Sequence, residues 1–194
     1  MPRPRISDRR DRILDAAEAL VLAQGFDAMS VASIAERAGI GKGAVYLEFA
    51  GKRDILDALL LRGNTRMAER VRHELGEHPR LSDACRETAR ALLADPLMTA
   101  AFLDDQGVLG AHVMEVTDGR YRERHRRVVD WFRELQERGL IVTDVDPRTL
   151  ALALSSTTIG LLSAARLLGP LDPVLLEGTI DTIGRMAATF ETER

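Results

Sequence analysis

Three observations on this sequence of 194 residues predict an all-α fold. Hydrophobic residues make up 45% of the chain but aromatic residues only 4%, which suits a core of Leu, Ala, Val and Ile between packed helices. Runs of β-branched residues are few. Asp-Pro pairs at 95–96, 146–147 and 172–173 each predict a helix start, because aspartate accepts hydrogen bonds from free N–H groups and proline lacks a donor that would be wasted there.

The first 50 residues predict three helices and their turns. The first helix is expected from near Ser7 to Gly25, since glycine accepts the left-handed conformation that ends a helix. Ser30 is a suitable N-cap for a second helix, Gly39 suits the turn after it, and a third helix covers about 41–47. The first helix carries the apolar stripe of an amphipathic helix: Ile13, Leu14, Ala17, Leu20 and Val21.

The rest of the chain predicts further helices without a flexible linker, an internal repeat or a low-complexity segment. A fourth helix is expected to run directly out of the first three, from about Lys52 to His78, before Pro79 ends it. It would act as a lever between two halves of the chain. The other helices are expected at about 82–94, 96–105, 120–138, 147–168 and 173–191.

Charge, cysteine content and hydropathy limit the classes of function. The net charge of −3 gives no general attraction for nucleic acid, so DNA binding must come from local positive charge. The single cysteine, Cys85, excludes an intramolecular disulfide and favours a cytoplasmic location, and the charged N-terminus predicts no signal peptide. The 17 uncharged residues between Arg148 and Arg166 are too few and too polar for a comfortable membrane span.

Residues 30–52 predict a unit that reads DNA. Two short helices joined by a tight glycine turn are the arrangement that lays one helix in the major groove. The backbone can approach the groove closely because the second of these helices begins with small residues. These are Gly41, Gly43 and Ala44.

Polar side chains that could contact DNA lie in the same segment, which also holds both lysines of the chain. Lys42 can reach a base edge or a phosphate, and Tyr46 lies one turn later on the same face, with a hydroxyl that can bond phosphate. Lys52 is expected to be a second phosphate anchor. Ser30 and Ser33 are expected to face the other strand, at a helix N-terminus that attracts phosphate.

In this segment the chain resembles the tetracycline-repressor (TetR) family of transcriptional regulators. The resemblance covers about 50 residues. It rests on Ile13-Leu14-x-x-Ala17, Gly25-Phe26, Ile34-Ala35, Ala38-Gly39-Ile40, Gly43-x-x-Tyr46, Phe49, Lys52-Arg53 and Ile55-Leu56.

The resemblance implies a homodimer whose two heads bind a palindromic double-stranded operator. It also implies a helical C-terminal domain with a pocket for a small-molecule effector, whose binding moves the fourth helix and weakens DNA binding. By position, Lys42, Ala44, Tyr46 and Lys52 inherit the contacts to DNA. The expected division is a DNA-binding head at 1–51 and a regulatory domain at 52–194, with dimerisation through about 147–191.

Two positions depart from the family pattern. Glu48, where family members often have histidine or tyrosine, places an acid near phosphate, and Ala32 stands where some members have a base-reading arginine. Lys42 is therefore expected to be the main polar reader. Residues 1–12 carry five arginines against two aspartates, which indicates either a solvated tail or an arm that touches phosphate.

No enzymatic or metal-binding pattern stands out. His73 and His78 resemble a zinc-protease signature that is one residue too long, so on a helix the two rings point about 140° apart. Cys85 has no histidine at a suggestive spacing and is expected to be a buried thiol. An enzyme is thus a remote alternative, and neither a metal nor a cofactor is expected.

Polarizable and aromatic side chains between residues 98 and 132 are more often core than cavity, but they could also line an effector pocket between helices. The glycines in this stretch would suit an adaptable entrance. The expected pocket residues are Met98, Phe102, Gln106, His112, Met114, Tyr121 and Trp131. Arginines at 120, 122, 124, 126 and 127 indicate a solvated face with ion pairs, or a site for an anionic effector or an acidic partner.

The last two helices carry the pattern of a dimer surface. The final helix has two apolar stripes, which predicts two neighbours, its own domain and a second subunit. One stripe is Leu176, Ile180, Ile183, Ala187 and Phe190, and the other is Leu175, Thr179, Thr182 and Met186. The expected interface residues are the first stripe with Leu154, Thr158, Leu161, Leu162 and Ala165 of the preceding helix.

The sequence therefore predicts a sequence-specific, dimeric DNA-binding regulator of transcription, a repressor released from its operator by an effector. The alternative is a constitutive DNA-binding protein with no effector. The two differ in whether a cavity exists in the region 96–132.

Overall fold

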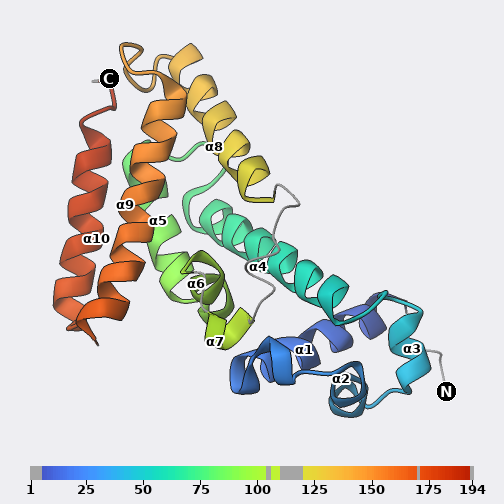
Figure 1. The fold of residues 1–194 in the computed structure, drawn as a ribbon. Coiled ribbons are helices and arrows are strands. Elements are labelled where there is room, and N and C mark those ends of the chain that lie inside the picture. Colours follow the sequence, from blue (N-terminus) through green and yellow to red (C-terminus); the bar gives the residue numbers. More distant parts are fainter. Residues whose placement is uncertain (1–5, 104–105, 110–119, 170, 193–194) are drawn as a thin grey trace. The chain divides into compact units, whose positions relative to one another are not determined.

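A computed structural model describes residues 6–103, 106–109, 120–169 and 171–192. These residues form helices and their connections, together with one isolated antiparallel bridge between Ile141 and Glu191 (Figure 1). The predicted all-α fold is confirmed. The helices are α1 (Ile6–Ala28), α2 (Val31–Ala38), α3 (Lys42–Tyr46), α4 (Lys52–Leu75), α5 (Leu81–Leu93), α6 (Pro96–Phe102), α7 (Gln106–Leu109), α8 (Arg120–Glu137), α9 (Pro147–Leu168) and α10 (Pro173–Ala188).

The three Asp-Pro pairs begin helices as predicted. The Asp95 carboxylate accepts a hydrogen bond from the Met98 N–H at 3.1 Å and caps α6. Asp146 and Asp172 accept backbone N–H bonds at 2.8 Å at the start of α9 and α10. The caps stabilise these helices because the first N–H groups have no partner inside the helix.

Several helix ends differ from the prediction. α4 ends at Leu75, because Gly76 takes a left-handed φ of 78°. α10 ends at Ala188, because the chain then turns to pair with the segment after α8, where Val142 N–H donates to Phe190 O at 2.8 Å. The short helix α7 was not predicted.

The chain forms two compact units. The first unit comprises the described residues within 1–66 and 95–115, and the second comprises those within 67–94 and 116–194. α4 contributes its first part to one unit and its last part to the other. The helices α6 and α7 therefore belong to the same unit as α1, α2 and α3.

Gly25 allows α7 to pack closely on α1. Its φ of 79° interrupts the helical geometry of α1, and a Cβ at this position would lie 2.5 Å from the Gly107 carbonyl oxygen. Any larger residue would combine backbone strain with a collision against backbone. The core of the first unit includes Ile13, Val21, Ile34, Val45, Ile55, Leu56 and Leu59, all fully buried.

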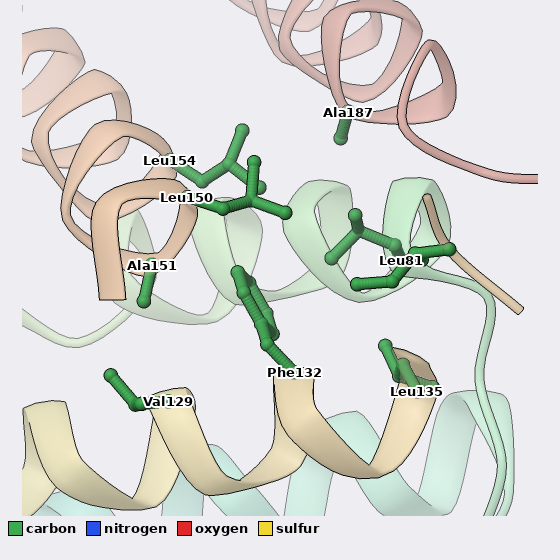
Figure 2. Packing of buried hydrophobic residues seen from close by; sticks show 9 residues of the cluster. Leu81, Val129, Phe132, Leu135, Leu150, Ala151, Leu154 and Ala187 are labelled. Atoms are coloured by element: carbon green, nitrogen blue, oxygen red, sulfur yellow. The ribbon is translucent and has the colours of Figure 1, made fainter. Parts of the chain in front are cut away.

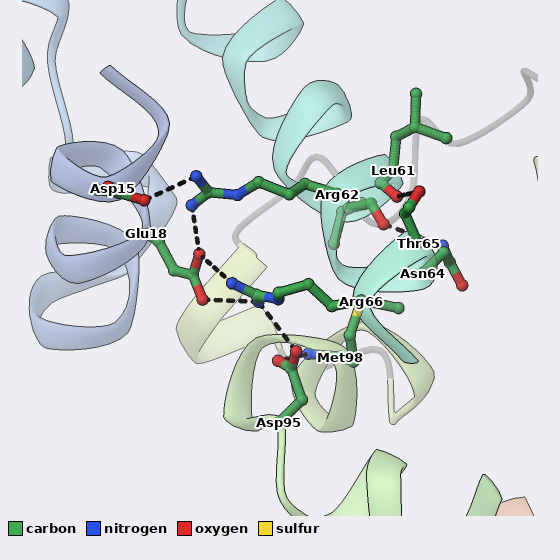
Figure 3. A network of polar contacts seen from close by, with 10 residues as sticks. Asp15, Glu18, Leu61, Arg62, Asn64, Thr65, Arg66, Asp95 and Met98 are labelled. Atoms are coloured by element: carbon green, nitrogen blue, oxygen red, sulfur yellow. Dashed lines mark hydrogen bonds and ion pairs between the residues drawn. The ribbon is translucent and has the colours of Figure 1, made fainter. Parts of the chain in front are cut away.

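An arginine–carboxylate network joins α1, α4 and α6 (Figure 3). Glu18 of α1 accepts hydrogen bonds from Arg62 at 2.7 Å and from Arg66 at 2.8 and 3.1 Å. Arg62 also pairs with Asp15, and Arg66 with Asp95, the cap of α6. Burial alone would raise the pKa of the Glu18 carboxyl, but the hydrogen bonds and charges of Arg66 and Arg62 lower it below its ordinary value.

The second unit is built around α5, α8, α9 and α10. Its main cluster packs side chains of α8 against side chains of α9 (Figure 2). Those of α8 are Val129, Phe132 and Leu135, and those of α9 are Leu150, Ala151 and Leu154. Leu81 of α5, Ile141 and Ala187 of α10 complete the cluster. A second cluster joins Ala89 of α5 to Leu161, Ile180 and Ile183. Gly184 of α10 admits the side chain of Arg86, since a Cβ there would lie 2.3 Å from Arg86 Nε.

We expect Glu18→Gln to lower the free energy of unfolding at pH 7 by about 1 kcal/mol. The substitution replaces the two partly exposed ion pairs of Glu18, with Arg62 and Arg66, by hydrogen bonds to an uncharged amide. Because the pKa of Glu18 is lowered in the folded state, its carboxylate contributes to the free energy of unfolding above pH 4.5. This contribution is lost as the pH falls through the folded-state pKa of Glu18. Urea unfolding between pH 7 and pH 3 would show a smaller loss on acidification in the variant. The exposed Glu36→Gln is the matched control, and identical pH profiles for wild type and Glu18→Gln would contradict this account.

Candidate nucleic-acid interface

The start of α2 is fixed by two serines. Ser33 N–H donates to Ser30 Oγ, and Ser30 N–H donates to Ser33 Oγ, both at 3.0 Å. This reciprocal cap satisfies two N–H groups that would otherwise lack a partner. Ser30 and Ala32 are exposed and Ser33 is half-buried, so this end of α2 is open to solvent.

The turn between α2 and α3 requires glycine. Gly39 has a φ of 65°, and its N–H bonds the carbonyls of Ala35 and Glu36 at the end of α2. The next helix begins at Gly41, which offers no side-chain cap. A two-helix unit with a tight glycine turn is thus confirmed over residues 31–46.

α3 presents a bare surface to solvent. Val45 is fully buried and fixes the inner face of the helix, while Lys42 and Tyr46 are exposed, the latter by 52%. A Cβ at Gly41 or Gly43 would meet no atom within 4 Å, so the backbone at the start of α3 can be approached from outside. Ala44 is half-buried on the flank of this surface.

Lys52, predicted to be a phosphate anchor, makes its contacts inside the protein. Its ammonium group donates to the carbonyl oxygens of Phe26, Asp27 and Met29, at 3.2, 3.2 and 3.3 Å, and lies 4.5 Å from the centre of the Phe26 ring. An ammonium has three N–H donors, and all three are used. Lys52 therefore ties the start of α4 to the α1–α2 connection and has no donor left for DNA.

The negative charge of Glu48 is paired with an arginine of the same chain. Its side chain is only 10% exposed, and its Oε1 accepts hydrogen bonds from both Nε and Nη2 of Arg9, the former at 2.8 Å. Arg10 donates to the Glu48 carbonyl at 3.3 Å and lies over the Phe49 ring. The acid that departs from the family pattern thus holds the start of α1 against the end of α3.

A third arginine of α1 supports the turn. Arg12 donates through Nη2 to the Ala38 carbonyl oxygen, and the same nitrogen lies 3.4 Å from the Gly39 carbonyl oxygen. Neither this role nor that of Arg9 was predicted. Their spacing of three residues on one helix face was the one available signal. Arg3 and Arg5, the other arginines of the proposed arm, lie outside the described residues.

The predicted pocket residues are not brought together in one described unit. Met98 is buried in the first unit against Gly63 of α4, where a Cβ would lie 2.4 Å from the methionine sulfur. Phe102 is half-buried in the same unit, whereas Trp131 belongs to the second unit and packs beside Phe132 at 5.2 Å between ring centres. His112 and Met114 lie outside the described residues, as do the side chains of Gln106 and Tyr121.

Most of the predicted dimer residues are buried within their own subunit. These are Leu154, Leu161, Leu162, Ile180, Ile183 and Ala187. Thr158, Ala165, Leu176 and Phe190 are half-buried. Periodicity identified two apolar stripes on α10 but could not say which one faces inward.

Other charged or reactive groups have structural explanations. Arg126 and Arg127 of the arginine run share Glu123 at 2.5 and 3.9 Å, as on a solvated helix face. Burial, helped by the nearby Glu191 charge, raises the pKa of the Cys85 thiol to about 12, so little nucleophilic thiolate forms at neutral pH. In the described part of the chain, no group of three or more His, Cys, Asp or Glu could hold a metal ion.

α1, α2 and α3 form the arrangement of a helix-turn-helix, in which the start of α3 is exposed. Residues 13–59 match the family model for bacterial regulatory proteins of the tetR family, so this segment is similar to the N-terminal part of such regulators.

Curated relatives agree over the N-terminal part. The chain is 35% identical over 96 residues to the HTH-type transcriptional repressor KstR of Rhodococcus jostii, a match that covers 48% of this chain and 45% of KstR. It is 43% identical over 53 residues to the regulator SrpR of Pseudomonas putida, covering 27% and 25% of the two chains. The matches thus span less than half the length of these relatives.

Solved structures agree over the whole fold. A TetR-family regulator from Rhodococcus sp. has a TM-score of 0.74 at 21% identity and covers 96% of this chain and 100% of that one. The fatty acid degradation regulator FadR from Bacillus halodurans has a TM-score of 0.68 at 20% identity and covers 96% of each chain. At these identities the similarity shows the fold alone.

The two lysines of the chain form a matched pair for testing the site. We expect Lys42→Met to leave the thermal stability unchanged, because Lys42 is exposed. DNA affinity should fall, and the slope of log affinity against log salt should decrease by about one, as for the loss of one phosphate contact. Fluorescence anisotropy with a labelled duplex over a salt series measures both. An unchanged affinity and slope would remove Lys42 from the interface.

For Lys52→Met we expect the opposite pattern. The free energy of unfolding should fall by about 2 kcal/mol, because three carbonyl groups lose a charged donor. Chemical denaturation measures this loss. A variant as stable as wild type, with the salt slope reduced, would restore Lys52 as a phosphate anchor.

Proposed function

We propose that this protein is a dimeric transcription regulator that reads operator DNA through α3. The observation that carries the proposal is the open start of α3, where Gly41 and Gly43 leave the backbone bare beside two exposed polar side chains, Lys42 and Tyr46. A recognition helix needs this combination of close approach and polar reach. Ser30, Ala32 and Ser33 at the exposed end of α2 would lie toward the second strand, and Ala44 beside the bases.

Selection of bound fragments from random-sequence DNA tests the proposal. We expect an enriched palindrome whose half-sites lie about one helical turn apart, or a multiple of it, because the two recognition helices of a dimer read the same groove face. A library without any enriched motif, bound equally by wild type and Lys42→Met, would contradict sequence-specific reading.

We further propose that the outward stripe of α10 forms the dimer interface. Leu175 and Met186 are 58% and 51% exposed, and Gly178, Thr179 and Thr182 lie between them along a shallow groove. On α9, Leu152 and Leu167 are 61% and 83% exposed. A soluble monomer would rarely leave so many large apolar side chains in water.

By length and composition, α9 is the one described helix that could cross a membrane, and 28% of its most apolar window is buried. Coverage by a second subunit explains its exposed apolar residues without a membrane. It also agrees with the inner face of α9, which packs on α8 in the core of the second unit.

Leu175→Glu should therefore produce a monomer, because a charge would be buried in the proposed interface without a partner. Light scattering after size exclusion should give twice the subunit mass of 21.4 kDa for wild type and the subunit mass for the variant. The control is Leu61→Glu on α4, which is 64% exposed in the first unit. A dimeric Leu175→Glu would exclude this face.

A small-molecule effector would release the protein from its operator. In this proposal residues 1–51 read DNA and residues 52–194 form the regulatory domain. One fold neighbour, the SmeT–triclosan complex, has a TM-score of 0.70 at 21% identity over 95% of this chain and 92% of that one. The contacts of α6 and α7 with α1 and α4, through Gly25 and the Arg66–Asp95 pair, would transmit a change at α6 or α7 to α1.

Gly25→Ala tests this coupling. We expect the variant to bind DNA more weakly than wild type, because the added Cβ must displace the Gly107 carbonyl and shift α1. Gly51→Ala is the control, since a Cβ there meets nothing within 4 Å. Equal DNA affinity for wild type and a folded Gly25→Ala would show that the α7 contact does not influence the head.

A further inference from the structure

We propose that the second unit contains a binding site for a small carboxylate with an apolar body, separate from the effector pocket. The site is a cavity of about 260 Å³. It is bounded by the α4–α5 connection, the end of α8 and the residues that follow α10. None of its lining residues is among those predicted for the effector pocket.

Apolar residues form one part of the cavity lining. Leu81, Leu135 and Ile141 line it and are each at most 2% exposed, and Leu140 and Ala188 complete the lining. A cavity of about 150 Å³ is sufficient for benzene. The larger volume here accommodates one ring or a branched chain together with a polar head group.

One side of the cavity carries a fixed charge pair. The Glu191 side chain is 6% exposed, its Oε1 accepts the Ser82 N–H at 2.8 Å, and its Oε2 accepts Arg80 Nε at 2.8 Å and Arg80 Nη2. Glu191 is thus a buried acid with three donors arranged around it. It fixes the Arg80 guanidinium by two hydrogen bonds, and both residues line the cavity.

The carboxylate of Glu191 stays ionised in this environment. Burial alone would raise its pKa, but the hydrogen bonds from Ser82 and Arg80 lower it below the ordinary value. Arg80 therefore keeps its counter-ion over the whole neutral range.

The cavity has more hydrogen-bond donors than acceptors at this polar side. Arg80 has five N–H donors, of which two point at Glu191, and its side chain is 67% exposed. His78, which also lines the cavity, has Nδ1 3.1 Å from Arg138 Nη1. Because arginine can only donate, Nδ1 accepts, and the Nε2–H of His78 remains available as a donor.

These groups select an acceptor head group. Glu191 already accepts three hydrogen bonds from the protein, whereas a ligand carboxylate would meet the remaining donors of Arg80 and His78. Charge-assisted bonds of this kind are among the stronger polar contacts in proteins. An aromatic or branched monocarboxylate satisfies both the walls and the donors.

Sodium benzoate is the probe for the test, with the full chain and methyl-labelled leucine and isoleucine. We expect saturable chemical-shift changes at the methyl groups of Leu81, Leu135 and Ile141. Benzamide, which keeps the ring and removes the charge, should bind about tenfold more weakly, and so should benzoate to Arg80→Gln, since each loses a charge-assisted bond. Ala188→Phe should abolish binding by filling the cavity.

The controls separate this site from general anion binding. Arg133→Gln removes an exposed arginine of α8 outside the cavity and should leave benzoate binding unchanged. Circular dichroism establishes whether each variant is folded. If Ala188→Phe does not fold, the benzoate affinity of Arg80→Gln tests the proposal. Absence of saturable shifts at these methyl groups, or benzoate binding to folded Arg80→Gln as tight as to wild type, would overturn the proposal. Neither result bears on DNA recognition by α3.

Discussion

The orientation of α2 and α3 depends on cationic side chains that donate to the ends of the head's helices. Lys52 bonds two carbonyls in the last turn of α1 and that of Met29 just after it, Arg12 bonds Ala38 at the end of α2, and Arg9 bonds Glu48 after α3. A five-residue helix such as α3 has almost no stability of its own, because helix nucleation costs more than one turn returns. Charged hydrogen bonds of about 1.5–3 kcal/mol each, together with burial of Val45, therefore hold it in place.

Some cationic side chains of the head contact other groups of the protein, and others are open to solvent. Arg9, Arg12 and Lys52 are used inside the protein, and Lys42 remains exposed at the start of α3. The surface proposed to face DNA is thus poor in side chains and rich in accessible backbone, which suits close approach more than extensive base readout. The chain as a whole carries a net charge of −3, so contacts at this surface must supply the attraction.

The sequence predicted the features that local chemistry determines. Aspartate before proline starts a helix regardless of what packs on it, and Gly39 ends α2 because few other residues accept its φ of 65°. The direction of Lys52 was not predictable, because its partners lie 23 to 26 residues earlier and become neighbours only in the folded unit. The same limit explains why Ile180 was assigned to the dimer surface: periodicity gives the stripes of a helix, and packing decides which one is inside.

Amide hydrogen exchange of the full chain, with and without a saturating DNA duplex, tests the central claim most directly. The account predicts that DNA protects the amides of residues 41–46 and of the start of α2. The Phe26–Met29 segment, already closed by Lys52, should show little change. Protection concentrated at Phe26–Met29 and Lys52, with residues 41–46 exchanging as in the free protein, would contradict the assignment of α3 as the reading helix.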